Sequence, residues 1–478
     1  MLKLLLLTIA FFVISLPISS QENNKANIST TEKKENYFYD HDLLPKNFHA
    51  ERRNALRELM PEGSVAIIFS NPIRNRSNDV DYEYHQDPNF YYLSGFREPN
   101  ALLLIFKEDI VIDSGKTNEI LYIPEKDAEK EVWTGRQLGT QATVEKLGIK
   151  LAQKNTIFTE KNFDFSIFSE VIYINPADDI RDDKNDKGDL YNLVKVFRNR
   201  IASDKVKSNK IKLKNFLDQL REIKQPEELA LIQKAIDITC DAQIELMKSL
   251  TPEMKEYQTE ALVEYIFKKE GAEHPGFPSI MGSGENSCIL HYTSNRKPLL
   301  KNELLVSDIG AEYHGYTADI TRTLPVNGKF SEEQKIIYNL VLQAQEAGIE
   351  ACKVGNKFWD PHTEATKVIT EGLLKLGIIK NSFHVNKYFT HGTSHYLGLD
   401  VHDAGTYGPL KENSIITVEP GIYIPEGSDC DKKWWNIGVR IEDDILITAS
   451  KPVILSGKAP RKVEDIELLM KEKGMFEK

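Results

Sequence analysis

The distribution of hydrophobic positions divides the chain into two regions of different character. Between residues 48 and 175, short apolar runs typical of buried strands alternate with amphipathic stretches of helical period. The pattern predicts helices over 48–60 and 125–138, and strands over 64–70, 90–96, 101–106, 119–123 and 171–175. This alternation indicates an α/β domain of modest size.

The second region begins with long helical patterns and continues with short strands. We predict helices over 207–223, 226–250, 332–352 and 362–376. The first of these helices is expected to link two domains, and from Pro278 onward the short strands contain most of the unusual polar residues. The stretch 178–189 (DDIRDDKNDKGD) is interpreted as a charged surface loop without a function of its own.

The first 35 residues show a different pattern. An apolar run over 4–18 follows Lys3 and ends at Ser19-Ser20, which is typical of a secretory signal peptide. The run is shorter than the roughly 20 residues of a membrane-spanning helix, and an uncleaved anchor is the alternative. We expect a signal peptide over 1–20, a flexible tether over 21–40 and an exported protein, periplasmic or secreted, without stable membrane insertion.

Composition excludes several classes of protein. The 478 residues include 61 Lys and Arg against 72 Asp and Glu, a net charge of −11, which argues against a nucleic-acid partner. Hydrophobic residues make up 41%, enough for a sizeable core. The four cysteines are too few for a disulfide framework, and none lies in a Cys-x-x-Cys pair that would bind zinc.

The segment 306–323 contains the first candidate site residues. Two β-like runs flank His314-Gly315, a plausible two-residue hairpin turn, which would pair Asp319 with Gly310. Asp308 would then lie on the same face as Asp319, diagonally across the ladder. Two close carboxylates repel each other unless a proton or cations hold them. The alternative is two ordinary strand aspartates in solvent.

Three histidines follow within twelve residues, His391, His395 and His402, although the chain has only 11 in total. Each alone would more often be a structural residue, and His391 and His395 lack the intervening Glu of the zinc-protease helix motif. Together, and beside a pair of aspartates, they favour metal ligation.

Two glutamates complete the candidate set. Glu419 ends the apolar run 415–418 before Pro-Gly, where a carboxylate is costly to bury without a partner. Arg440 and Glu442 share one face of a predicted strand, so Arg440 could neutralise that carboxylate, or the two could form a plain ion pair. Several carboxylates with one imidazole suit a pair of divalent ions such as manganese or cobalt better than a structural zinc. Two metals sharing a water generate a nucleophile at neutral pH.

In order and in flanking sequence, five of these residues resemble the metal ligands of the creatinase/methionine aminopeptidase ("pita-bread") metallopeptidases. They are Asp308, Asp319, His395, Glu419 and Glu442. The likeness is strongest to the aminopeptidase P family, includes the segments 91–99, 133–139 and 282–293, and spans about 45–455. It implies an N-terminal creatinase-like α/β domain over 41–205 and a pita-bread catalytic domain over 206–478.

The resemblance implies two divalent metal ions, with Mn²⁺ expected and Co²⁺ or Zn²⁺ as alternatives. Asp308 would hold one metal and contact the substrate amine. Asp319 and Glu442 would bridge both metals, and His395 and Glu419 would complete the other site.

The remaining implied roles concern the substrate. Glu419 would take a proton from the bridging water and pass it to the leaving nitrogen. His291 and His402 would contact the scissile peptide, and His391 would line the proline pocket near Arg440.

The implied activity is that of an Xaa-Pro aminopeptidase, which removes the first residue from peptides with proline second by means of a metal-bridging hydroxide. The resemblance also implies a homo-oligomer, dimer or tetramer.

The intervals of 24 and 23 residues from His395 to Glu419 and from Glu419 to Glu442 favour this family over an Xaa-Pro dipeptidase (prolidase). Methionine aminopeptidase fits less well because it lacks the N-terminal α/β domain. A non-catalytic peptide-binding module on the same fold is the remaining alternative. Tyr91 stands where the family often has Trp, which bears on a substrate contact between subunits.

Overall fold

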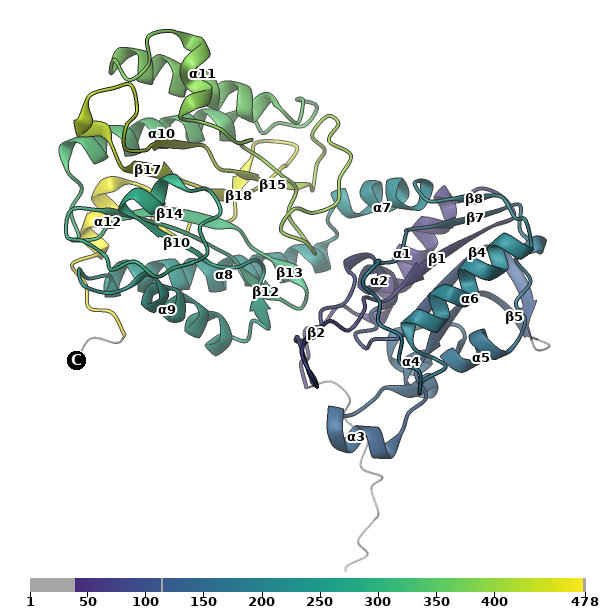
Figure 1. The fold of residues 1–478 in the computed structure, drawn as a ribbon. Coiled ribbons are helices and arrows are strands. Elements are labelled where there is room, and N and C mark those ends of the chain that lie inside the picture. The colour runs from purple at the N-terminus through teal and green to yellow at the C-terminus, as the bar shows by residue number, and fades with distance from the viewer. Residues whose placement is uncertain (1–38, 113–114, 476–478) are drawn as a thin grey trace, which may run out of the picture. The chain divides into compact units, whose positions relative to one another are not determined.

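The computed structural model describes residues 39–112 and 115–475, and the predicted signal peptide and most of the predicted tether lie outside the described residues. Residues 40–478 form one compact unit. This unit contains a mixed six-stranded sheet in its N-terminal part and several small antiparallel sheets in its C-terminal part (Figure 1). The α/β fold class predicted from the sequence is therefore confirmed.

The N-terminal domain is a sheet covered on both faces. Its strands run in the order β6-β5-β4-β1-β7-β8. One face packs on α5 and α6 through residues such as Val65, Leu104 and Phe197, while α1 contacts β4 and α7 contacts β7. The elements are α1 (Lys46–Leu59), β1 (Ser64–Phe69), β2 (Asn75–Ser77), β3 (Val80–Asp81), α2 (Pro88–Ser94), β4 (Leu102–Ile112), β5 (Gly115–Ile123), α3 (Ala128–Thr134), α4 (Gly139–Leu147), β6 (Ala152–Lys154), α5 (Asn155–Glu160), β7 (Glu170–Tyr173), α6 (Leu190–Ser203), β8 (Ser208–Asn209) and α7 (Lys212–Glu222).

Two predictions in this domain are wrong. Residues 90–96, predicted as a strand, belong to helix α2: Asp87 caps its start by accepting the Phe90 N–H, and Gly95 ends it at φ +70°. Of the single helix predicted over 125–138, only α3 forms, because Gly135 ends it at φ +89°, and α4 begins beyond the predicted range at Gly139. The stretch 178–189 is a loop, as predicted, although Asp189 at its end is buried and caps α6.

The C-terminal domain places small sheets between two pairs of helices. Figure 1 shows α8 and α9 on one side of the strands and α10 and α11 on the other, and side chains from all four helices share one core with the strands. The elements are α8 (Pro226–Ser249), α9 (Glu256–Lys269), β9 (His274–Pro275), β10 (Ile280–Ser283), β11 (Leu304–Ile309), β12 (Ala311–Tyr313), β13 (Tyr316–Thr317), β14 (Ile320–Pro325), α10 (Glu332–Glu350), α11 (Asp360–Lys375), β15 (Ile415–Val418), β16 (Gly421–Ile424), β17 (Ile437–Arg440), β18 (Asp443–Leu446), β19 (Val453–Ile454) and α12 (Val463–Leu469).

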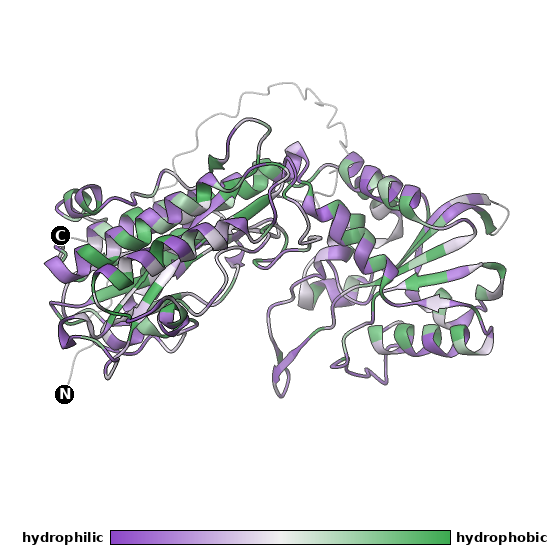
Figure 2. Ribbon diagram, turned by 90° about the horizontal axis from the view of Figure 1, so that it is seen from above, coloured by the Kyte–Doolittle hydropathy of each residue, from purple (hydrophilic) through white to green (hydrophobic). Residues whose placement is uncertain are grey.

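Hydropathy follows this layering. In Figure 2, hydrophobic residues run along the central strands and alternate with hydrophilic residues along the helices. Of the helices within the described ranges, none combines the length and apolar character of a membrane span.

Candidate metal centre and active site

The hairpin that positions the two aspartates has the predicted register. β12 and β13 meet at His314-Gly315, both of which have positive φ, as this tight two-residue turn requires. The pairs on either side, Ile309 with Ile320 and Glu312 with Thr317, share one register, which sets Asp319 opposite Gly310. A methyl group on Gly310 would lie 1.8 Å from the carbonyl oxygen of Ala318, so the close approach of the two chains requires glycine.

Asp319, His395 and Glu442 form the centre of the site. One ligand atom from each lies within 4.8 Å of the others, and this is the one such group of potential metal ligands within residues 39–112 and 115–475. His395 Nδ1 lies 3.0 Å from the Tyr396 carbonyl oxygen and therefore carries the proton. Nε2 then faces Asp319 Oδ2 at 3.3 Å and Glu419 Oε1 at 3.6 Å. An imidazole nitrogen that faces two carboxylates is arranged to share a cation with them, either a metal ion or a proton.

The carboxylates of this cluster are crowded and incompletely paired. Asp308 Oδ1 and Asp319 Oδ1 are buried without a hydrogen-bond partner. Burial and the neighbouring Asp308 raise the pKa of Asp319 well above its ordinary value, and burial and the neighbouring Asp319 do the same for Glu442. Four carboxylates and one imidazole in a protein interior fit divalent ions, and with all four carboxylates ionised their charge of −4 balances two such ions.

Arg440 is paired differently from the prediction. Its Nη2 donates to Asp308 Oδ2 at 2.6 Å rather than to Glu442. Its Nε donates to the Thr321 hydroxyl at 3.2 Å, and that hydroxyl in turn donates to Glu442 Oε2 at 2.6 Å. The predicted continuous strand is broken, since Arg440 ends β17, Asp443 begins β18, and the two strands belong to different sheets.

A cavity of about 420 Å³ opens onto this cluster. Seven of the nine residues predicted from the sequence line it: His291, Asp308, His391, His395, His402, Glu419 and Arg440. The other two, Asp319 and Glu442, are buried beside His395. The sequence reasoning therefore identified residues that the fold does bring together.

The histidines of the cavity lie in different environments. His391 Nδ1 is 2.7 Å from the Gly392 carbonyl oxygen, and Nε2 accepts the Tyr423 hydroxyl proton at 2.8 Å. Burial and Arg440 lower the pKa of His391 to about 4, so the ring is neutral. The His402 ring packs edge-on against the His395 ring, with 4.4 Å between the ring centres. Burial lowers the pKa of His402 as well.

Several residues of the site had no signal in the sequence. Tyr423 on β16 bridges His391 and Arg440, whose Nη1 donates to its hydroxyl at 2.9 Å. Trp359 and Tyr407 line the cavity and are half exposed. The strand period could not have placed Tyr423 beside Glu419, because β15 ends at Val418 and β16 begins at Gly421 in a different sheet.

A buried arginine fixes the ligand strands to one another. Arg322, next to Thr321 on β14, is fully buried and uses all its donors. Nη1 donates to the carbonyl oxygens of Thr321 and Glu442, and Nη2 pairs with Asp443 at 2.8 Å. Nε donates to Pro460 and Nη2 also to Ala459. This network holds the backbone of Glu442 beside the strand that follows Asp319.

The fold and this cluster define a metallopeptidase. Residues 230–449 match the model for metallopeptidase family M24, and residues 49–164 match that for the aminopeptidase P N-terminal domain. The chain belongs to metallopeptidase family M24, with the pita-bread catalytic domain after the N-terminal domain.

Its similarities lie with the aminopeptidase P enzymes of that family. The chain is 36% identical over 431 residues to the Xaa-Pro aminopeptidase of Escherichia coli, covering 88% of this chain and 96% of that protein. The structure of Pseudomonas aeruginosa aminopeptidase PepP superposes with a TM-score of 0.80 at 33% identity, covering 90% and 99% of the two chains. Zinc-substituted E. coli aminopeptidase P in complex with product gives 0.79 at 33% identity, again covering 90% and 99%.

Proposed function

We propose that this protein is a dinuclear-metal Xaa-Pro aminopeptidase, which hydrolyses the first residue from peptides with proline in second position. The observation that carries the proposal is the cluster of Asp308, Asp319, His395, Glu419 and Glu442 at the floor of a cavity lined by further histidines. The names of the similar proteins support the same substrate class.

The metal pair is assigned by charge and donor type. Asp319 and Glu442 would bridge two ions, Asp308 would complete one site, and His395 and Glu419 the other. Manganese is our proposal because carboxylate-rich sites with one imidazole suit it, and zinc and cobalt remain competitors to be tested. Bound ions of this kind lower the pKa of a shared water to near neutrality and polarise a carbonyl.

The residues around the ions supply the remaining chemistry. Glu419 accepts a proton from the attacking water and delivers it to the leaving proline nitrogen. The exposed His291 and the neutral His402 lie on the cavity wall and donate to the scissile carbonyl as negative charge develops on it. Asp308, held by Arg440, receives the free amine of the first residue.

Proline specificity follows from the missing N–H. A proline in second position has a fixed φ and no amide proton, so a compact pocket near His391 needs no acceptor for it. Alanine in that position would fill the pocket less well and bring an unpartnered N–H, at a cost of roughly 1–3 kcal/mol. That penalty corresponds to about 10- to 100-fold in rate.

The test compares four substrates with purified enzyme and Mn²⁺: Xaa-Pro-Yaa, Xaa-Ala-Yaa, Xaa-Pro and N-acetyl-Xaa-Pro-Yaa. We expect cleavage of Xaa-Pro-Yaa at least as fast as of the dipeptide, slower cleavage of the alanine peptide and none of the acetylated one. Cleavage confined to the dipeptide would make the protein a prolidase. Binding of Xaa-Pro-Yaa without hydrolysis at full metal occupancy would instead indicate a peptide-binding module.

Export and self-association complete the proposal. The apolar run over 4–18 supports export, and the resemblance to aminopeptidase P supports a dimer or tetramer. Light scattering on the metal-loaded protein gives the molar mass directly, and a monomer at all concentrations would contradict self-association.

A further inference from the structure

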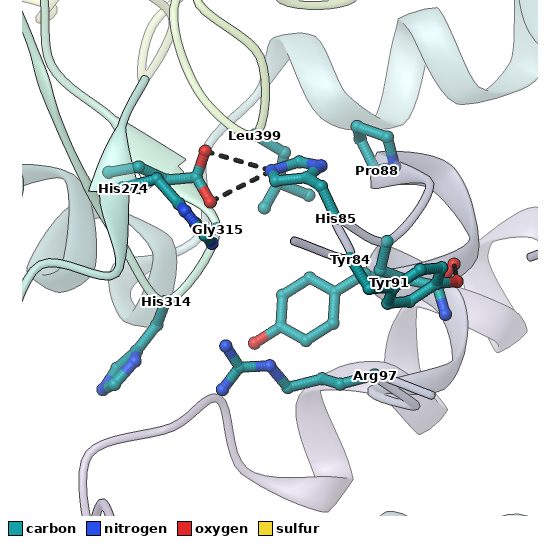
Figure 3. Close-up of a pocket in the computed structure, with 11 residues that line it drawn as sticks. Tyr84, His85, Pro88, Tyr91, Arg97, His274, His314, Gly315 and Leu399 are labelled. Atoms are coloured by element: carbon teal, nitrogen blue, oxygen red, sulfur yellow. Dashed lines mark hydrogen bonds and ion pairs between the residues drawn. The ribbon is translucent and has the colours of Figure 1, made fainter. Parts of the chain in front are cut away.

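Away from the catalytic cluster, three histidines join the N-terminal domain to the catalytic domain. Each is paired with a carboxylate from the other domain, and together they surround a pocket seen in Figure 3. We call this group the histidine clasp, and its members are Asp42, Glu83, His85, Glu273, His274, Glu312 and His314.

The first pair is the one drawn with dashed lines in Figure 3. His85, in the loop between β3 and α2, lies 3.0 Å through Nε2 from both carboxylate oxygens of Glu312 on β12. Asp400 contributes a further negative charge to this histidine. The His274 ring lies 6.1 Å away, centre to centre.

The second pair lies beside the first with the roles of the two domains exchanged: the histidine comes from the catalytic domain and the carboxylate from the N-terminal domain. His274 on β9 lies 3.5 Å through Nδ1 from Glu83, which is largely exposed. His274 and Glu312 are partners in the β9–β12 ladder, so the two pairs form adjacent links between the same segments. One segment is the loop 83–85 and the other is the edge of the hairpin that positions Asp319.

The third histidine is the most enclosed. His314 is 2% exposed, and its two ring nitrogens lie 2.8 Å from Glu273 and 3.0 Å from Asp42. Arg97 also pairs with Glu273 at 3.1 Å, and the neighbouring Tyr313 donates to Asp42 at 2.7 Å. The Lys234 ammonium lies 5.9 Å from the Tyr313 ring centre. A histidine that faces a carboxylate at each nitrogen is arranged to bind a second proton.

We propose that the histidine clasp is a pH-sensitive fastening, closed when His85 and His314 are protonated, which holds the N-terminal domain against the rim of the catalytic domain. A lysine or arginine at these positions would stay charged at every physiological pH, whereas histidine changes charge within it. The clasp residues Glu83, His85, His274 and Glu312 also line a cavity of about 620 Å³ that reaches Asp400 and His402. Release of the clasp therefore loosens one wall of this second cavity, which shares His402 with the catalytic cavity.

The direction of the effect follows from the charges. The hydrogen bond to Glu312 raises the pKa of His85, and for His314 the bonds to Glu273 and Asp42 outweigh burial and raise its pKa too. A histidine whose pKa is raised by folding stabilises the closed state below its ordinary value of about 6.5 and loses that contribution as pH rises through the folded value. The clasp therefore closes in acid and releases towards alkaline pH.

Hydrogen exchange of the segment 80–86 tests the clasp without relying on catalysis. The metal-loaded enzyme is compared at about pH 6 and about pH 8, on either side of the ordinary histidine pKa, after correction for the intrinsic pH dependence of exchange. After this correction, we expect exchange to be several-fold faster at the higher pH. Each unit by which the pKa of a histidine differs between the clasped and released states changes the equilibrium between these two states about tenfold. Equal exchange at both pH values would overturn the proposal.

Two variants and a control make the assignment specific. The double variant His85→Gln, His314→Asn removes both titrating rings, and asparagine tolerates the positive φ of 51° at position 314. Glu312→Gln breaks the His85–Glu312 pair by changing the partner that the catalytic domain supplies. Both should exchange rapidly at either pH, whereas His384→Gln, outside the clasp, should retain the pH dependence of the parent. Full pH dependence in the double variant would refute the role of these histidines.

Discussion

Replacing Asp319 by asparagine removes one negative charge from the carboxylate cluster while keeping the size of the side chain. The residue is 5% exposed, and one of its oxygens has no hydrogen-bond partner. On the proposed assignment, the change deletes a ligand that both ions would share, so we expect the ions to be lost together from the metal-loaded protein. In protein from which a chelator has removed the metal (the chelated protein), the same change removes a negative charge that neighbouring carboxylates repel. The substitution should therefore act in opposite directions in the two states.

The size of the metal effect can be worked out from linkage. Each ion present at about 100 times its Kd stabilises the native enzyme by about 2.7 kcal/mol, so the two proposed ions contribute about 5.4 kcal/mol. For a domain the size of the matched segment 230–449, one kcal/mol shifts Tm by about 2–4 °C. We therefore expect metal to raise the Tm of the native enzyme by about 11–22 °C, and the variant to lose this rise.

The effect in the chelated protein has the opposite sign. Because burial and Asp308 raise the folded pKa of Asp319 above its unfolded value, the native fold loses stability as pH rises past the ordinary aspartate range. Asparagine does not ionise, so chelated Asp319→Asn should melt at a higher temperature than the chelated native protein at about pH 8.

Thermal unfolding by circular dichroism, with and without Mn²⁺, measures both effects, and elemental analysis gives the metal content. Asp237→Asn is the matched control, because Asp237 on α8 accepts a hydrogen bond from Gln233 and lies outside the cluster. Two metals per chain and a full metal-dependent rise in Asp319→Asn would refute the ligand assignment. A lower Tm of the chelated variant than of the chelated native protein would refute the electrostatic account.

Three further predictions follow from other features. Glu419→Gln should lower kcat by about 100-fold or more, the usual scale for a general acid–base group, and near-normal kcat at full metal content would remove Glu419 from the proton transfer. Arg322→Met leaves Asp443 without its main partner and should cost about 3–5 kcal/mol in urea unfolding; a loss well below that range would contradict the anchoring role. We propose export, so mass spectrometry of the native protein should find its start near Gln21, and a start at Met1 in the cytosolic fraction would overturn this.

Elements with local chemical signals could be predicted from the sequence. The turn at His314-Gly315 was predicted correctly because glycine after a residue that tolerates positive φ is a local property, and it set the register of Asp319. Residues 90–96 were mistaken for a strand because their aromatic content suits one. The capping groups that decide the matter are Asp87, three residues before this stretch, and Gly95 near its end.

Contacts between distant segments could not be predicted in this way. Arg440 and Glu442 share a face only if one strand is continuous, and the strand is interrupted because the Glu442 N–H donates to Thr321, 121 residues earlier. Arg440 consequently meets Asp308, 132 residues away, and no sequence period contains that information. The candidate ligands nevertheless lie close together in the fold, because the family resemblance supplied the long-range grouping.

The separation of the ligands along the chain has a consequence for the biogenesis of the enzyme. Asp308 lies on β11 and Glu442, 134 residues later, lies in the break between β17 and β18, so the proposed ion-binding geometry arises only after slow, long-range strand pairing. A metal cannot template the early steps of folding in such a chain, and loading is the last event of maturation. If the chain is exported, as we propose, and crosses the membrane unfolded, the ion would then be selected by whichever metals are abundant where the chain finishes folding, rather than by those of the compartment where it was synthesised.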